Sequence, residues 1–294
     1  MDGIIVINKP KGYTSHDIVY KVKKITGEKV GHTGTLDPNA TGVLPILIGK
    51  GTLLSKYLIN HDKIYEVVLK LGEKTDTADI EGKVIEKENV NINLLEKSNI
   101  EAVLNSFLGK QMQMPPMYSA IKVNGKKLYE YARKGEKIEV QSREIEIYNI
   151  KLLGVDTNNL EIFFEVSCSK GTYIRSLCED IASRLNTVGY MKELKRTKVG
   201  EFSIDESLTF KELEQSNNKK ELLEKHLLTI DMIFNESEKI ELNEKTLRLF
   251  LNGVKIKQSM RDGIYKIYNY EKQFIGTGII ENNSLKRDII IYNK

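Results

Sequence analysis

One short segment of the chain concentrates the residues that could perform chemistry. Residues 31–42 place a single carboxylate, Asp37, among three glycines and Pro38. Glycine permits backbone angles that other residues resist, and proline fixes one dihedral, so this loop restricts where Asp37 can point. A carboxylate held in this way can act as a nucleophile or a base. The alternative is a tight turn in which the Asp37 side chain bonds its own backbone.

A second segment suits nucleic acid. Between residues 122 and 137, six basic residues stand against two acidic ones, and Tyr129 and Tyr131 lie among them. Phosphates require cations and unstacked bases require flat surfaces, so this combination favours RNA as a partner. The alternative is a solvated surface helix. The net charge of the whole chain is only +4, so the inference depends on this local patch.

The remaining composition argues against several classes of protein. The two cysteines, Cys168 and Cys178, and the four histidines lack the spacing of metal ligands, so we expect no metal or cofactor. We expect both cysteines to be buried apolar residues. No apolar run approaches the roughly 18 residues that cross a membrane, and no signal peptide is recognisable, which favours the cytoplasm. No Gly-x-x-x-x-Gly-Lys-Ser/Thr loop occurs, which argues against an NTPase.

Apolar periodicity predicts a mixed α and β chain with one large and one small unit. Ser15 is expected to be the N-cap of a helix that ends near Gly27. Further helices are predicted at 52–59, 100–108 and 171–185, and residues 211–225 read as a surface helix or an insertion. Strands are predicted at 4–8, 43–48, 64–71, 83–86, 144–153 and 160–167. Three short strands at 264–270, 274–280 and 288–292 indicate a small β-rich unit.

Several motifs occur in one order along the chain. They are Asn8-Lys9-Pro10-Lys11-Gly12, residues 31–42, Lys63-Ile64-Tyr65, Arg133, Gly171-Thr172-Tyr173-Ile174-Arg175 and Leu194-Lys195-Arg196-Thr197. Together, over about residues 3–202, they closely resemble the bacterial TruB family of tRNA pseudouridine(55) synthases. The tail from about residue 240 resembles a small PUA-type RNA-binding domain, through Leu251-Asn252-Gly253 and Phe274-Ile275-Gly276-Thr277-Gly278.

The resemblance implies an α+β fold in two domains. A pseudouridine synthase catalytic domain, built on a mixed, mainly antiparallel sheet, would span residues 1–235 and carry a thumb-like insertion at about 113–137. A small β-rich PUA-like domain would span 240–294. The implied activity is conversion of uridine 55 in the T-loop of tRNA to pseudouridine by base flipping. The implied enzyme binds the T-arm stem-loop as a monomer in the cytoplasm, with no cofactor and no obligatory protein partner.

The resemblance also implies catalytic residues. Asp37 would attack the target nucleoside, either at C1′ of the sugar or at C6 of the uracil, and the detached uracil would rejoin through carbon. Arg175 would pair with Asp37, because a neighbouring guanidinium favours the ionised carboxylate; a surface salt bridge is the alternative. Tyr65 would stack on the flipped uracil, and its hydroxyl could help to remove the C5 proton. A tyrosine at the edge of the core is the alternative.

Residues that serve RNA binding are implied as well. His32 would occupy the space left by departing bases, since extruding a uridine costs stacking energy. Asp79 would help to position Tyr65 and Arg175, and Lys9 falls in an N-terminal motif that packs behind the aspartate loop. The set assigned to RNA binding consists of His32, Lys9, Asp79, Tyr173, Lys122, Lys126, Lys127, Arg133 and Arg196.

Two other functions compete with this one. A guide-RNA-dependent synthase of the dyskerin type shares the aspartate loop, but it normally has protein partners and a C-terminal domain larger than this tail of roughly 55 residues. A non-catalytic RNA-binding or tRNA-folding protein could use the same cleft. Changing Asp37 to Asn distinguishes the last case, because a protein that only binds should be unaffected.

Overall fold

Most of the chain is organised around one ten-stranded sheet. The computed structural model describes residues 1–119, 121–136 and 138–292. The strand order is β14-β1-β3-β12-β4-β11-β10-β7, with β13 paired to β12 and β2 paired to β3. Among the strands of the described residues, only the β1–β14 and β3–β12 pairs of this sheet are parallel, so the expected mixed, mainly antiparallel sheet is confirmed. The strands are β1 (Gly3–Lys9), β2 (Val30–His32), β3 (Thr41–Ile48), β4 (Lys63–Leu71), β7 (Gly109–Gln113), β10 (Arg143–Asp156), β11 (Glu161–Cys168), β12 (Gly189–Val199), β13 (Phe202–Ser203) and β14 (Leu208–Thr209).

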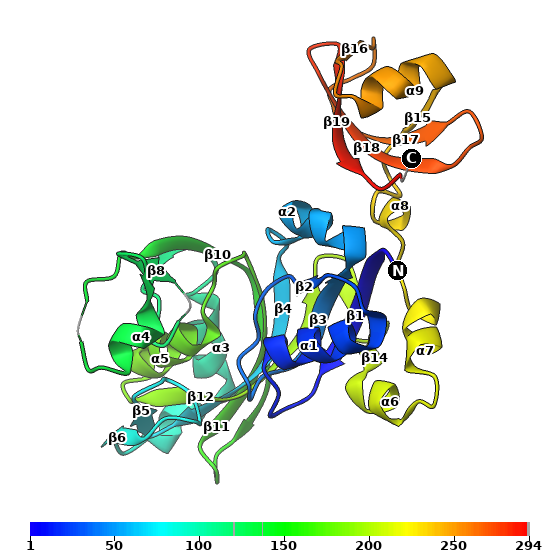
Figure 1. Cartoon of the computed structure of the whole chain (residues 1–294). Coiled ribbons are helices and arrows are strands. Elements are labelled where there is room, and N and C mark those ends of the chain that lie inside the picture. Colours follow the sequence, from blue (N-terminus) through cyan, green and yellow to red (C-terminus); the bar gives the residue numbers. More distant parts are fainter. Residues whose placement is uncertain (120, 137, 293–294) are drawn as a thin grey trace.

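Helices pack against this sheet in two groups (Figure 1). At one end α1, α6 and α7 share an apolar core with β1 and β3, and at the other end α3 and α5 pack on β4, β10 and β11. No helix in the described part of the chain is both long and apolar enough to cross a membrane. The helices are α1 (Ser15–Thr26), α2 (Ser55–Leu58), α3 (Lys97–Asn105), α4 (Leu128–Ala132), α5 (Ile174–Arg184), α6 (Phe210–Gln215), α7 (Lys219–Lys225), α8 (Ile230–Ile233) and α9 (Glu244–Leu251), with 3₁₀ turns η1 (Gly49–Leu54) and η2 (Ile92–Leu95).

The N-cap of helix α1 lies one residue earlier than predicted. Thr14 is the N-cap: its hydroxyl accepts the backbone N–H of Asp17, and the Asp17 carboxylate accepts the N–H of Thr14. The prediction of Ser15 as N-cap was therefore wrong, because the reciprocal Thr-x-x-Asp pair was overlooked. Ser15 is instead the first helical residue, and its side chain is free to bond another segment.

Strand β12 was not predicted, yet it joins the two halves of the main sheet. Two bulges interrupt its pairing with β4, between Met191 and Glu193 and between Arg196 and Lys198, so no regular apolar alternation marks it in the sequence. Its parallel pairing with β3 is unusually close at Gly42. A Cβ there would lie 2.1 Å from the Arg196 carbonyl oxygen, and the φ of +104° also favours glycine.

The C-terminal unit has its own sheet and core. Its order is β15-β17-β18-β19-β16, and helix α9 packs on this sheet around residues that include Phe250 and Ile267. The unit follows α8 in the chain (Figure 1), and Ile289 on β19 shares an apolar cluster with Leu54 and Leu58 of the main domain. The predicted strand at 288–292 was displaced, since the observed strand begins earlier. The strands are β15 (Lys239–Leu242), β16 (Ile256–Lys257), β17 (Gly263–Asn269), β18 (Phe274–Glu281) and β19 (Ser284–Ile290).

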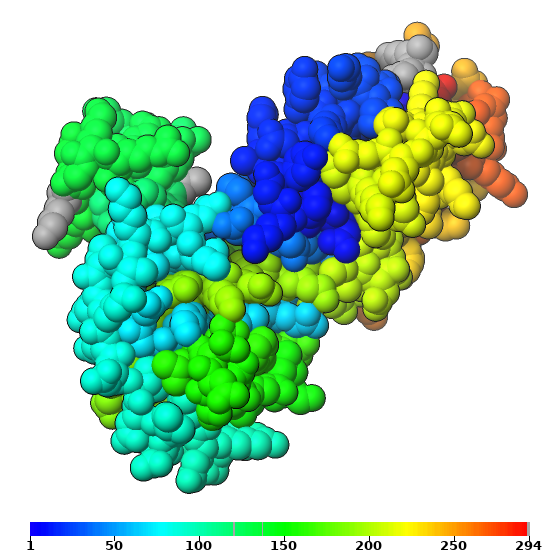
Figure 2. All heavy atoms as spheres, turned by 90° about the horizontal axis from the view of Figure 1, so that it is seen from below, coloured from blue at the N-terminus to red at the C-terminus, as the bar shows by residue number. Residues whose placement is uncertain are grey.

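Two hairpins project from the main sheet. The first joins β5 (Glu73–Thr75) to β6 (Val84–Lys87), and the second joins β8 (Lys122–Val123) to β9 (Lys126–Lys127) ahead of α4. The second lies in the thumb segment, residues 113–137, in which positions 120 and 137 lie outside the described residues. The alternative of one basic surface helix was wrong, because Asn124 and Gly125 adopt positive φ and make a turn. Figure 2 shows a hollow between this green segment and the blue N-terminal part.

Candidate active site

The loop that carries Asp37 is tied down on both sides of the carboxylate. Ahead of it, the Ser15 hydroxyl accepts the N–H of Leu36 at 2.9 Å and donates to the Leu36 carbonyl at 3.2 Å. Behind it, the Pro38 carbonyl accepts the N–H of Gly12 at 2.9 Å. The loop joins β2 to β3, so the sheet and α1 together fix the backbone of Asp37.

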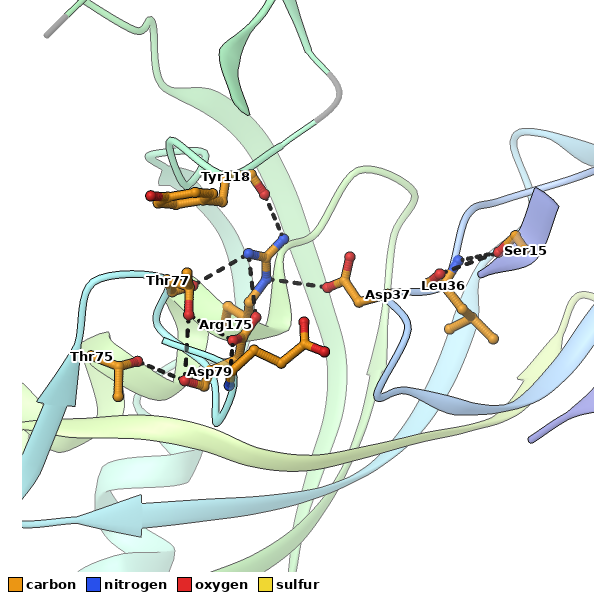
Figure 3. A network of polar contacts seen from close by, with 9 residues as sticks. Ser15, Leu36, Asp37, Thr75, Thr77, Asp79, Tyr118 and Arg175 are labelled. Carbon is orange, nitrogen blue, oxygen red and sulfur yellow. Dashed lines mark hydrogen bonds and ion pairs between the residues drawn. The ribbon is translucent and has the colours of Figure 1, made fainter. Parts of the chain in front are cut away.

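Arg175 forms an ion pair with the Asp37 carboxylate. The distance from Arg175 Nε to Asp37 Oδ2 is 3.3 Å, and the Arg175 side chain is only 8% exposed while that of Asp37 is 40% exposed. Figure 3 shows Asp37 on one side of the guanidinium and Thr77 and Asp79 on the other. Arg175 also donates to the carbonyls of Thr77 at 3.3 Å and Tyr118 at 2.8 Å. The guanidinium is thus oriented by neighbours that do not depend on Asp37.

Asp79 pairs with Arg175 on the side of the guanidinium away from Asp37. Its Oδ2 lies 3.6 Å from Arg175 Nη1, and its Oδ1 accepts the Thr77 hydroxyl at 2.6 Å and the Glu81 N–H at 3.1 Å (Figure 3). The structure therefore brings Asp79 to Arg175, as the sequence suggested. Among the described residues, Asp79 and Tyr65 share no hydrogen bond.

Tyr65 lies in the same cavity as Asp37, on β4, and is 8% exposed. Burial raises the pKa of its hydroxyl, and the nearby Arg196 guanidinium opposes only part of that rise. Arg196 lies opposite Tyr65 because β12 pairs with β4 at this position. The hydroxyl is therefore protonated at neutral pH. A phenol in this state offers a ring face and a hydrogen bond, and it is a poor proton acceptor.

A cavity of about 470 Å³ opens beside these residues, lined by Asp37, Tyr65, Arg175, Tyr118 and Tyr129 together with the start of α5. Its walls are mostly apolar or aromatic, and it is large enough to hold one nucleoside. A larger hollow of about 980 Å³ lies elsewhere, next to residues 232–237, but it contains no carboxylate paired with a guanidinium. The smaller cavity is therefore the candidate active site.

His32 ends strand β2 and is half-buried. Its Nδ1 is buried without a hydrogen-bond partner among the described residues. Burial, together with the charges of Arg196 and His16, lowers the pKa of the imidazole, so the ring is neutral at pH 7. A flat, neutral ring near the aspartate loop suits contact with bases. The structure does not place His32 in the cavity wall itself.

Two residues assigned to RNA binding are buried instead. Lys9 is 0% exposed, and its ammonium donates to the carbonyls of Pro10 at 3.0 Å, Tyr13 at 2.6 Å and Pro38 at 3.1 Å. Arg196 is 1% exposed and donates to the carbonyls of Gly34 at 2.9 Å and Val43 at 2.8 Å. Both side chains hold the backbone near Asp37, so neither is an exposed RNA contact; Lys9 packs behind the aspartate loop, and Arg196 also lines the cavity.

The thumb cations lie on the surface as expected. Lys122, Lys126 and Arg133 are exposed and Lys127 is half-buried. Lys127 and Arg133 both lie over the Tyr129 ring, at 5.4 and 5.3 Å from its centroid, which keeps these cations beside a cavity-lining aromatic residue. The geometry supplies the combination of charge and flat surface that RNA requires.

Tyr173 is the N-cap of α5 and lines the cavity. Gln113, which sequence reasoning missed, bonds its backbone. Gln113 Nε2 donates to the Tyr173 carbonyl at 3.0 Å, and the Tyr173 N–H donates to Gln113 Oε1 at 2.8 Å. Gln113 is 4% exposed. The local sequence does not indicate that Gln113 bonds Tyr173 or that Ser15 bonds Leu36, because these partners are 60 and 21 residues away.

Titratable side chains elsewhere do not suggest a metal centre. Within residues 1–119, 121–136 and 138–292, no group of three or more His, Cys, Asp or Glu side chains could hold an ion. Cys168 and Cys178 are buried as predicted, and burial raises the pKa of the Cys168 thiol to about 12. The two thiols are therefore apolar core groups.

Comparison with known proteins shows the family to which the chain is similar. Residues 21–174 match the model of the TruB family pseudouridylate synthase N-terminal domain. Residues 175–235 match the tRNA pseudouridylate synthase B C-terminal domain, and residues 239–286 match the pseudouridine synthase II TruB C-terminal model. The three matches follow one another along nearly the whole chain.

Individual relatives cover the chain almost completely. A protein of Clostridium novyi (strain NT) named tRNA pseudouridine synthase B is 44% identical, with 97% of this chain and 98% of the relative aligned. A protein of the same name from Caldanaerobacter subterraneus subsp. tengcongensis is 40% identical over 97% and 98%. Among solved structures, a chain of a Cbf5–Nop10–Gar1 complex shares the fold, with a TM-score of 0.68, 24% identity and coverage of 99% of this chain and 84% of that one. The chain belongs to the TruB family of pseudouridylate synthases.

Proposed function

We propose that this protein converts uridine 55 in the T-loop of tRNA to pseudouridine, using Asp37 as the reacting carboxylate. The observation that carries the proposal is the Asp37–Arg175 pair at 3.3 Å in a cavity that also holds Tyr65. The names of the relatives, tRNA pseudouridine synthase B, support tRNA as the substrate.

The target base cannot reach Asp37 while it is stacked, so the nucleotide must flip into the cavity. There Asp37 would attack C1′ of the ribose or C6 of the uracil, with Arg175 orienting the carboxylate. The Tyr65 ring would hold the base by stacking. Rejoining through C5 then requires loss of the C5 proton. The protonated Tyr65 hydroxyl does not suit that step, so we assign to Tyr65 the stacking role only.

We further propose that the enzyme acts alone on tRNA, as a monomer, without an obligatory protein partner. The relatives named tRNA pseudouridine synthase B match this chain over 98% of their own length, and the chain has its own thumb cations and C-terminal sheet. The Cbf5 chain comes from a complex with Nop10 and Gar1, but at 24% identity that likeness concerns the fold alone. Because its substrate would be tRNA, we expect the protein to act in the cytoplasm.

The test is to incubate the purified protein with an unmodified tRNA transcript and to map pseudouridine along the RNA. We expect one pseudouridine, at position 55, without any added protein or guide RNA. A transcript with cytidine at position 55 is the matched control and should remain unmodified. Modification that requires a guide RNA or a protein partner would contradict the stand-alone proposal, and unaltered uridine in every condition would contradict the activity.

A further inference from the structure

Four cationic side chains line the Asp37 cavity, although Asp37 is its only carboxylate among the described residues. Arg175 is occupied by Asp37 and Asp79. The other three are Lys63, Lys170 and Arg196. Among the described residues, none of these three takes part in an ion pair.

Strand pairing explains why these cations meet. Lys63 begins β4 and pairs with Cys168, the last residue of β11, so Lys170 follows at the same edge of the sheet. Tyr65 is two residues beyond Lys63 on the same face of β4, and Arg196 lies opposite Tyr65 on β12. The cations therefore gather on one wall of the cavity, next to the ring on which the flipped base would stack.

The two lysines are anchored to one turn. Lys63 Nζ donates to the His61 carbonyl, and Lys170 Nζ donates to Asn60 Oδ1 at 2.6 Å. Lys63 is 9% exposed. Its ammonium has three donors and only one protein acceptor among the described residues, so it can still bond a ligand. Asp62, whose charge favours the Lys63 ammonium, accepts a hydrogen bond from the Tyr148 hydroxyl at 3.1 Å.

Such an arrangement is costly without an anion. Burial and the charges of Arg196 and Lys170 lower the pKa of Lys63, so the neighbouring cations disfavour its charged form. An incoming anion would reverse that repulsion. A nucleotide brings its phosphate at a fixed distance from its base, and the base would stack on Tyr65, which follows Lys63 on the same face of β4.

We propose that Lys63 and Lys170, supported by Arg196, form a subsite for one backbone phosphate that flanks the flipped uridine. The inference rests on the proposed function and deepens it. The subsite holds the nucleotide by its phosphate while Tyr65 holds it by its base. These two contacts fix the ribose between them, so that C1′ and C6 are presented to Asp37.

The test uses full-length enzyme and a T-arm stem-loop RNA in which a neutral methylphosphonate replaces the phosphate on the 5′ or the 3′ side of the target uridine. With wild type, we expect one of the two replacements to lower kcat/KM about tenfold, the usual worth of one charge-assisted hydrogen bond. Lys63→Met and Lys170→Met should each lower kcat/KM about tenfold on unmodified RNA. In these variants the same replacement should change kcat/KM less than about twofold.

Lys70→Met is the matched control, because Lys70 lies on the same strand outside the cavity and also donates to one carbonyl, that of Asn159. It should behave as wild type. If the losses from the methylphosphonate and from the lysine substitutions are additive, or if neither replacement affects wild type, the subsite is wrong. The lysine variants could instead show a lower kcat that is the same whichever phosphate is replaced. That result would point to stabilisation of the detached uracil and would also contradict the phosphate subsite.

Thermal unfolding of each variant separates a defect in folding from a defect in phosphate binding. Lys170 is exposed, so Lys170→Met tests the proposal even if Lys63→Met unfolds. Wild type on unmodified RNA tests the proposed function separately. If wild type forms no pseudouridine there, the activity itself is wrong, whereas a normal wild type with additive losses contradicts only the phosphate subsite.

Discussion

Arg175 is the residue at which three segments of the chain meet. It contacts the aspartate loop through Asp37, the turn after β5 through Thr77 and Asp79, and the thumb segment through the Tyr118 carbonyl. A planar guanidinium can serve these partners at once because its donors point in fixed, divergent directions. A lysine ammonium is a single point of charge and cannot span them.

Arg175→Lys should therefore lower kcat about 100-fold, because Asp37 would lose its fixed orientation. Single-turnover formation of pseudouridine is the measurement. Arg184→Lys is the control, since Arg184 lies on the same helix, outside the cavity, and stacks on Phe107. A normal rate for Arg175→Lys would show that orientation by the guanidinium is unimportant.

Lys9 makes the stability of the fold depend on pH. Burial lowers its pKa to about 8, although the Asp37 charge opposes the shift. Between about pH 8 and the usual value near 10.5, the unfolded chain binds the Lys9 proton and the folded chain does not. The contribution of Lys9 to the free energy of unfolding therefore rises with pH in this window.

Wild type should gain stability relative to Lys9→Met as pH rises from 8 to 10, by up to about tenfold in the unfolding equilibrium constant per pH unit. Urea denaturation of both proteins at several pH values measures this difference. A constant difference would mean that Lys9 keeps its proton in the folded state. At pH 7, Lys9→Met should also leave the three backbone carbonyls without their donor and loosen the Asp37 loop.

Sequence reasoning at the residue scale brought the right types of side chain together but could not state their burial. Asp37, Tyr65 and Arg175 do share one cavity. Lys9 and Arg196 read equally well as RNA contacts and as internal donors, because a basic residue in a motif has no mark of its solvent exposure. Their burial follows from strand pairings between segments far apart in the sequence.

At the scale of elements, the start of α5 is fixed by the end of β7. Gln113, the last residue of β7, pairs with both backbone groups of Tyr173, and the Ser176 hydroxyl donates to the Met114 carbonyl at 3.0 Å. The thumb segment begins at this clamp. The base of the thumb is therefore bonded to the helix that carries Arg175.

Gln113→Ala should leave the backbone groups of Tyr173 without partners in a buried place and cost about 1–3 kcal/mol in the free energy of unfolding. It should also lower kcat, because the start of α5 positions Arg175. Gln111→Ala is the control on the same strand, where one bond to the Phe107 carbonyl is removed. If the two variants have equal kcat, the clamp contributes to stability alone.

The elements themselves were predicted unevenly. Strands with clear alternation, such as β4 with buried residues at every second position, were found close to their true bounds. Strand β12 was missed because its bulges break the alternation, and the basic hairpin at residues 122–127 was obscured by its polar composition. Ser15 was misplaced by one position, since Thr14 supplies a better capping residue in combination with Asp17.

At the scale of the whole molecule, the cavity lies between the main sheet and the thumb, and the thumb cations face outward. Figure 2 shows the hollow that separates the thumb from the N-terminal part. An RNA stem-loop entering this hollow would meet exposed cations before its flipped base reached Asp37. The electrostatic part of binding should therefore reside in the thumb segment.

Changing Lys126 and Arg133 together to Gln should weaken RNA binding and reduce the slope of log affinity against log salt by about 1 for each phosphate that these side chains neutralise. Titrations of a T-arm stem-loop at several salt concentrations measure the slope. Lys211→Gln with Lys220→Gln is the control, because these exposed lysines lie on α6 and α7, far from the thumb (Figure 1). Equal slopes for the two double variants would place the RNA elsewhere.

The most direct test of the account is the single-turnover rate of Asp37→Asn on an unmodified tRNA transcript, with the Kd for that tRNA measured in parallel. Asparagine keeps the shape of the side chain and removes the anionic oxygen. We expect pseudouridine formation to fall at least about 1,000-fold while Kd stays within about threefold of wild type. Pseudouridine formed by Asp37→Asn at a rate near that of wild type would contradict the assignment of Asp37 as the reacting group.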